Sequence, residues 1–133
     1  MTEPSRTDPS RHERRPRVGL LFDYDWDALA HQALAPSFHY DRAGFDLFSF
    51  PSNARLINFD LGAFAAKQAR RARQRGWTGV VSHHEQFGAL AAALLAERMG
   101  WPGTPVAAVL ACQHKHWARR VLQRVAPEAT TGF

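Results

Sequence analysis

The chain has 133 residues, of which 45% are hydrophobic, so it can form one compact domain with a core but not two of ordinary size. Its single cysteine, Cys112, excludes an internal disulfide and a cysteine-based zinc site, and we expect this thiol simply to be buried. The formal charge of +5 comes almost entirely from arginine, because Lys67 and Lys115 are the only lysines. Charge alone does not separate a phosphorylated ligand from a nucleic acid.

Residues 1–16 combine three prolines with serine, threonine and charges of both signs, a composition typical of a disordered tail. This stretch has no apolar run like that of a signal peptide. The longest apolar run, residues 88–96, is far shorter than the roughly 20 residues that cross a bilayer. We therefore expect a soluble, cytoplasmic protein.

Residues 18–22 form a short apolar run that Asp23 closes, which is typical of a strand buried on both faces of a parallel sheet. An aspartate shortly after this run can cap a helix over residues 28–35. A second strand is predicted over residues 45–50, and a turn over residues 51–53 follows it.

The next helix has the clearest boundaries in the sequence. Asp60 is placed to be its N-cap, Phe59 and Phe64 can form a hydrophobic staple across the cap, and Gly76 marks its end. A third strand is predicted over residues 79–82.

A largely apolar helix is predicted over residues 85–99. Residues 106–111 fit either a helix or a strand, and residues 113–125 read as an amphipathic helix. Strands and helices alternating in this way predict an α/β fold, an open parallel sheet flanked by helices with right-handed crossovers.

Ligands of such sheets bind beyond the carboxyl ends of the strands. The sequence brings three loops to that edge, at residues 23–25, 51–53 and 83–85. The candidate residues of the crevice are Asp23, Tyr24, Ser52, Asn53, His83 and His84. No glycine-rich phosphate loop follows the first strand, and an acidic turn there would repel a pyrophosphate, so a dinucleotide-binding enzyme is not expected.

We expect no metal site. Adjacent residues at a helix start point in different directions, so His83, His84 and Glu85 have poor spacing for a chelate. Capping by Ser82 or His83, with Glu85 favouring the positive end of the helix, explains them better, although one histidine could contact a ligand.

Two other charged groups have simple explanations. Asp23, Asp25 and Asp27 could bind a divalent cation, but capping and solvation also account for them. The arginines of residues 70–75 complement the carboxyl end of a helix and read as a solvated face.

The end of the chain resembles the end of the amino-terminal domain of ATP-grasp ligases, the group that includes biotin carboxylase. The matching residues are Gly100-x-Pro102-Gly103-Thr104-Pro105, Ala111-Cys112-Gln113-His114-Lys115 and Arg119-Arg120-Val121-Leu122. The resemblance implies that Lys115 is the lysine that reaches toward the phosphates of ATP. His114 departs from the family pattern, in which an aspartate usually precedes this lysine.

The resemblance implies a Rossmann-like pre-ATP-grasp domain over residues 17–112 and, over residues 113–133, a helix leading toward an absent ATP-binding domain. The parent protein would be an ATP-dependent carboxylate ligase that uses ATP and magnesium. Its substrate would be a small carboxylate. Because the family's lid and magnesium ligands lie in later domains, we expect this chain alone to be inactive and to bind ATP at best very weakly.

Two alternatives remain open. The chain could be a stand-alone flavodoxin-like binding or interaction module without catalysis, or, less favoured, a nucleic-acid-binding module that uses its arginines. A ligase parent predicts an exposed apolar face on the helix over residues 117–125, left uncovered by missing domains. Complete burial of this helix, or a symmetric dimer packed on it, would favour a stand-alone module.

Overall fold

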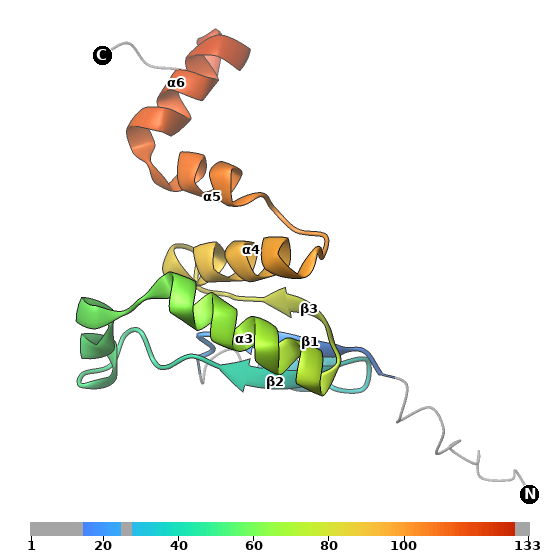
Figure 1. Ribbon diagram of the computed structural model, residues 1–133. Helices are drawn as coiled ribbons and strands as arrows, with labels where there is room; N and C mark the ends of the chain where they lie inside the picture. The colour runs from blue at the N-terminus through green and yellow to red at the C-terminus, as the bar shows by residue number, and fades with distance from the viewer. Residues whose placement is uncertain (1–14, 25–27, 130–133) are drawn as a thin grey trace, which may run out of the picture.

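The structure, a computed structural model, describes residues 15–24 and 28–129. It is an α/β fold with an open parallel sheet of three strands in the order β2-β1-β3 (Figure 1). The strands are β1 (Arg17–Leu21), β2 (His39–Ala43) and β3 (Trp77–Val81). The predicted fold class is confirmed, whereas the tail expected over residues 1–16 lies almost wholly outside the described residues.

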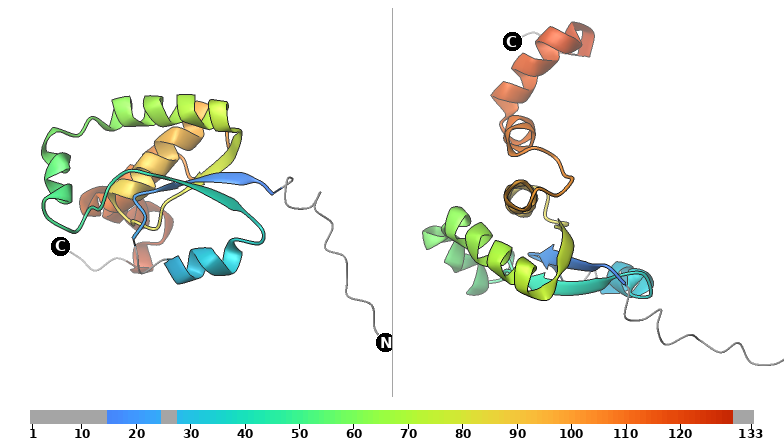
Figure 2. Two further views of the ribbon diagram at one scale, coloured as in Figure 1. Left: turned by 90° about the horizontal axis from the view of Figure 1, so that it is seen from below. Right: turned by 45° about the vertical axis from the view of Figure 1, so that its right-hand side comes forward.

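Helices lie on both sides of the sheet. Figure 2 shows α2 (Ala28–Leu34) on one side of the strands and α3 (Leu61–Arg75) on the other. Next to α3 lies α4 (Phe87–Met99), which contacts both β3 and β1. The main core therefore forms between the sheet and the α3–α4 layer.

The last helices continue beyond α4, away from the sheet (Figure 1). They are α5 (Val106–Gln113) and α6 (Lys115–Val125), and a short 3-10 turn, η3 (Pro127–Ala129), follows them. The segment that fitted either a helix or a strand is thus helical. No residue of α5 or α6 is buried, and Cys112, which we expected to be buried, is exposed.

The predicted boundaries of α3 are confirmed. Asp60 Oδ1 accepts a hydrogen bond from the Ala63 amide at 2.8 Å, and Gly76 ends the helix with a φ of 67°, a left-handed conformation that glycine adopts without a Cβ clash. The rings of Phe59 and Phe64 lie with their centroids 5.2 Å apart across the helix start, as expected for a hydrophobic staple.

The second predicted strand is wrong. Residues 45–50 form no strand, and β2 lies earlier, over the polar stretch His39–Ala43. Asp46 explains the first half of this error, because its side chain accepts hydrogen bonds from the amides of Phe48 and Ser49 and closes a turn. The turn at residues 51–53 is likewise replaced by a 3-10 helix, η2 (Ser52–Asn58).

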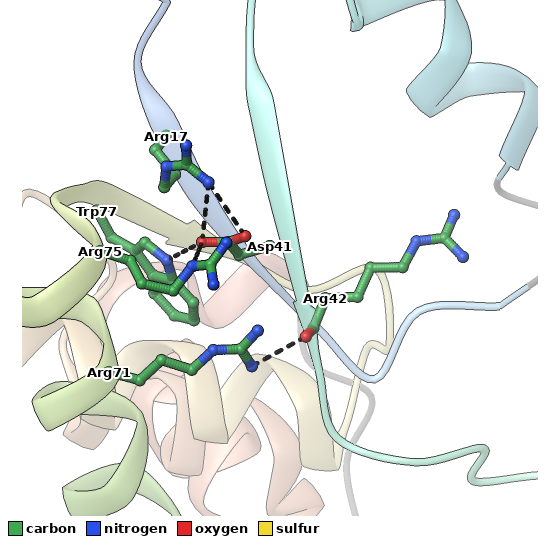
Figure 3. A network of polar contacts seen from close by, with 6 residues as sticks. All are labelled: Arg17, Asp41, Arg42, Arg71, Arg75 and Trp77. Carbon is green, nitrogen blue, oxygen red and sulfur yellow. Dashed lines mark hydrogen bonds and ion pairs between the residues drawn. The ribbon is translucent and has the colours of Figure 1, made fainter.

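A buried aspartate explains why so polar a segment becomes a strand. Asp41 points toward the α3 side of the sheet and accepts hydrogen bonds from Trp77 Nε1 at 2.6 Å and from Arg75 Nε at 2.8 Å. Arg17 on the central strand pairs with it at 3.3 Å (Figure 3). One carboxylate thus links all three strands to the end of α3.

The arginines of α3 are only partly the solvated face that we expected. Arg70 and Arg73 are exposed, but Arg75 binds Asp41. Arg71 donates to the carbonyl oxygen of Arg42 at 3.0 Å and lies over the Trp77 ring, 5.5 Å from its centroid (Figure 3).

The indole of Trp77 reaches Asp41 by crossing the central strand at Gly19. A Cβ built on Gly19 would collide with that ring, with Trp77 Cη2 only 2.9 Å away. The absence of a side chain at this position lets an edge-strand tryptophan extend over β1 to the carboxylate on β2.

We predict that Gly19→Ala destabilises the protein by about 1–3 kcal/mol, because the new methyl group displaces Trp77 from Asp41. Gly79→Ala is the matched control, since a Cβ on Gly79 meets no atom within 4 Å. Urea unfolding of both variants is the measurement. Equal stability of the two variants would contradict this account of Gly19.

The network also sets the pKa of Asp41. Burial, the largest single effect, raises the pKa of this carboxyl group. The hydrogen bonds from Trp77 and Arg75 and the charges of Arg75 and Arg17 outweigh burial together, so the pKa lies below its ordinary value of 3.8.

A lowered pKa means that the unfolded chain takes up this proton more readily than the folded one. The stabilisation from Asp41 is therefore complete above the ordinary pKa and is lost as the pH falls through the folded-state value. We predict that Asp41→Asn is less stable at neutral pH and loses less further stability as the pH falls below about 4. Thermal unfolding between neutral and acid pH tests this; parallel profiles of the two proteins would show that Asp41 is not responsible.

Candidate functional site

The carboxyl ends of β1 and β3 mark the place where a ligand site is expected. The chain passes from β1 to β2 on one side and then returns to β3 on the other side of β1. The loops after β1 and β3 therefore flank the point where the strand order reverses, which is where open α/β sheets bind ligands.

The backbone conformation of Phe22 sets the direction in which the chain leaves β1. Its φ of 53° is left-handed, a strained conformation for a residue with a large side chain. The ring is 1% exposed and packs with centroid distances of 5.1–5.5 Å against Phe45, Phe64 and Phe87. Aromatic packing thus holds a strained turn directly before Asp23.

Asp23 lies between a histidine and an arginine. Its side chain is 4% exposed, with Oδ2 3.0 Å from Arg42 Nε and Oδ1 3.2 Å from His31 Nδ1. These contacts are close but poorly aligned, so neither carboxylate oxygen has a well-aligned hydrogen-bond donor among the described residues. A buried carboxylate in this condition is a candidate to bind a ligand or to orient a catalytic group.

His31 joins the two loops. It comes from α2, is 6% exposed, and its Nε2 lies 2.9 Å from Nε2 of His83, which follows β3. The Tyr40 ring of β2 flanks it, with centroids 5.2 Å apart. Asp23, His31 and His83 thus form a continuous polar row from the buried loop after β1 to an exposed residue after β3.

His84, next to His83, has a different role. Its Nδ1 accepts a hydrogen bond from the Gly88 amide at 3.2 Å in the first turn of α4. Its ring lies near Tyr24 and Phe48, with centroids 6.1 and 5.7 Å away. The N-cap residue of α4 is Gln86, whose side chain makes no capping hydrogen bond. The first-turn amide that we expected Ser82 or His83 to satisfy is thus bonded by His84, while Ser82 Oγ donates to the Leu21 carbonyl oxygen at 2.8 Å.

The structure brings four of the predicted crevice residues together and separates two. Asp23, Tyr24, His83 and His84 lie in the loops after β1 and β3. Ser52 and Asn53 do not follow a strand, because β2 ends at Ala43; they lie in η2, where Asn53 Nδ2 donates to the Phe48 carbonyl oxygen at 3.2 Å.

Sequence reasoning missed His31 and Arg42. His31 lies inside a correctly predicted helix, but the hydrophobic pattern of that helix does not indicate which way the His31 side chain points. Arg42 lies in a stretch that we took for a connection. Side chains alternate across a strand, so a strand predicted at residues 39–43 would have placed Arg42 and Asp41 on opposite faces of the sheet. Arg42 would then have been expected on the face that contacts the loop after β1.

A small cavity of about 180 Å³ opens beside Asp23. Its walls are Asp23, Arg42, Ala43, Gly44, Phe45 and Asp46. A carboxylate and a guanidinium group therefore face the same space, which suits a small polar ligand.

The end of α5, two residues before Lys115, contacts the loop after β3. Gln113, at the end of α5, donates from Nε2 to the carbonyl oxygens of Gln86 at 2.6 Å and Glu85 at 3.3 Å. This contact ties the junction of α5 and α6 to the loop after β3. Lys115 is the first residue of α6 and is exposed.

No protein-family model, curated protein or solved structure matches the chain. Within residues 15–24 and 28–129, no three side chains of histidine, cysteine, aspartate or glutamate gather as a metal site. None of the helices there has the length and apolar character needed to cross a membrane.

We predict that Gly88→Ala disturbs the loop after β3, because a Cβ there would collide with Ser82 Oγ and lie 2.7 Å from His84 Cβ. The expected loss is about 1–3 kcal/mol of stability, together with shifted amide resonances of residues 82–85. Chemical unfolding and nuclear magnetic resonance (NMR) spectra are the measurements. Unchanged resonances would show that the loop does not depend on this close approach.

Proposed function

We propose that the chain is the substrate-side domain of a cytoplasmic, ATP-dependent carboxylate ligase of the ATP-grasp type. The observation that carries the proposal is the contact of Gln113 with the loop after β3. It ties the start of α6, where Lys115 lies, to the loop after β3, which supports a nucleotide site beside that loop. A phosphate near Lys115 and a small substrate in the crevice would then approach each other.

The charges of this edge suit the proposed chemistry. A carboxylate substrate attacks the terminal phosphorus of ATP, ADP leaves with the electron pair of the broken bond, and a nucleophile then displaces phosphate from the acyl phosphate. Cationic groups stabilise the charge that develops on the transferred phosphoryl group. Lys115 supplies one such charge, and Arg42 is the candidate to hold the substrate carboxylate. The remaining charge, with ATP and magnesium, would come from a further domain.

The exposed face of α6 supports the need for such a domain. Trp117 is 53% exposed and Val125 is 72% exposed, and Val121 and Leu122 lie on the same helix at 40% each. A large exposed apolar surface on an amphipathic helix marks a contact with another protein surface. A homodimer that covers α6 is the alternative arrangement.

The stand-alone binding module remains the second candidate. It is favoured by the small cavity beside Asp23, whose walls include Asp23 and Arg42 and suit a small polar ligand. A module of this kind would bind its ligand with full affinity in the absence of ATP and of any further domain.

We predict that magnesium–ATP binds this chain only in the millimolar range, equivalent to about −4 kcal/mol. The amide shifts that it causes should centre on the start of α6. Lys115→Ala should weaken binding by about threefold, as expected for one exposed charge contact. NMR titration measures both effects.

Lys67→Ala is the matched control, because Lys67 is the only other lysine and is exposed on α3. It should leave ATP binding unchanged. Micromolar affinity, or equal effects of the two substitutions, would contradict the proposed place of the nucleotide.

A further inference from the structure

We infer that Asp23, His31 and His83 form a proton relay that makes His83 Nδ1 the general base of the crevice. Its substrate group is a protic nucleophile, a primary ammonium or a hydroxyl group. This inference names the partner of the acyl group in the proposed ligase, and it rests on the proposed function only for that nucleophile. Asp23 and His31 are positioning residues, because they act through His83.

The positions of the ring nitrogens decide where the protons lie. Asp23 Oδ1 is 3.2 Å from His31 Nδ1, and the negative charge favours a proton on that nitrogen. The Nε2 of a neutral His31 then carries a lone pair. His83 Nε2, 2.9 Å away, must supply the proton between the two rings. The lone pair of His83 is consequently on Nδ1.

The same contact limits the charge of the pair. Two cationic imidazoles would each carry a proton on Nε2, and two N–H groups cannot face each other at 2.9 Å. One added proton is accommodated at His83 Nδ1. The resulting imidazolium still donates from Nε2 to His31, which in turn lies against the carboxylate of Asp23.

The groups around the pair keep these roles distinct. Arg42, on β2, lies 3.0 Å from Asp23 Oδ2 and leaves Oδ1 to face His31. The uncharged Tyr40 ring covers one side of His31. His84 is unsuited to act as the base, because its Nδ1 already accepts the Gly88 amide. His83 is exposed, so a ligand can reach it.

The proposed step moves one proton. An N–H bond of the ammonium breaks and its electron pair stays on nitrogen, while the lone pair of His83 Nδ1 forms the new N–H bond. The free amine can then attack the acyl phosphate. The contact between Asp23 and His31 is close but poorly aligned, and catalytic hydrogen bonds commonly tighten when substrate binds.

The first test is the tautomeric state of the histidines in the unmodified chain. Nitrogen-15 NMR of histidine-labelled protein, at a pH where the rings are neutral, should show His31 protonated on Nδ1 and His83 protonated on Nε2. The opposite assignment, or rapid averaging of His83 between both forms, would overturn the relay. This measurement requires no ATP, so it stands or falls separately from the proposed function.

The second test changes the carboxylate. An asparagine at position 23 can donate to His31 Nδ1, which reverses both tautomers, as in a serine protease whose triad aspartate is replaced by asparagine. In Asp23→Asn we expect the His83 proton on Nδ1. The rate at which diethyl pyrocarbonate modifies His83 at that nitrogen should fall by about tenfold, the effect expected for loss of a charge-assisted hydrogen bond.

Asp41→Asn is the matched control, because it removes another buried carboxylate that does not contact either ring. Its histidine tautomers and its rate of His83 modification should equal those of the unmodified chain. An unchanged rate in folded Asp23→Asn would show that Asp23 does not act through His31. If that variant does not fold, the tautomers of the unmodified chain decide the question.

Discussion

The fold depends on one carboxylate that three strands share. Asp41 is the buried acceptor toward which Arg17, Arg75 and Trp77 point, and these donors lie on β1, at the end of α3 and on β3. A buried charge is costly unless it is fully paired, and here the pairing is built into the topology. Among the described residues the sheet has three strands, so two of its three strands are edge strands. The network around Asp41 supplies contacts across the strands that a larger sheet would obtain from additional strand pairing.

The same strand connects this network to the candidate site. Side chains alternate across a strand, so Asp41 faces α3 while Arg42 faces the loop after β1. The backbone of Arg42 is held by Arg71 from α3, and its side chain is paired with Asp23. The position of Asp23 is thus fixed from one side by the β2 strand and from the other by the packed ring of Phe22. The polar edge of this small sheet is held in place because side chains on both faces of β2 have partners: Asp41 on the α3 side and Arg42 on the side of the loop after β1.

Much of the fold could be predicted because local signals and packing agree. The apolar run of β1, the Asp60 cap and the Gly76 stop each indicate the same structure that tertiary contacts require. The prediction failed at β2, where a strand is stabilised by charged partners far away in the sequence while the more apolar stretch after it is bent by Asp46. No local pattern contains Arg75 or Trp77, so the strand could not be recognised from its own residues.

The candidate site was predictable only where it coincides with strand ends. Asp23 and His83 follow apolar runs, so the topology rule found them, whereas His31 comes from the middle of α2 and its contact with His83 spans 52 positions. That contact changes the roles that we assign to the two histidines of His83-His84-Glu85. Neighbouring histidines are poor joint ligands, but when one caps α4 and the other meets a buried histidine, the two have separate roles. Adjacent residues at a strand-to-helix turn point in different directions, and this divergence lets one short loop both secure a helix and face a ligand.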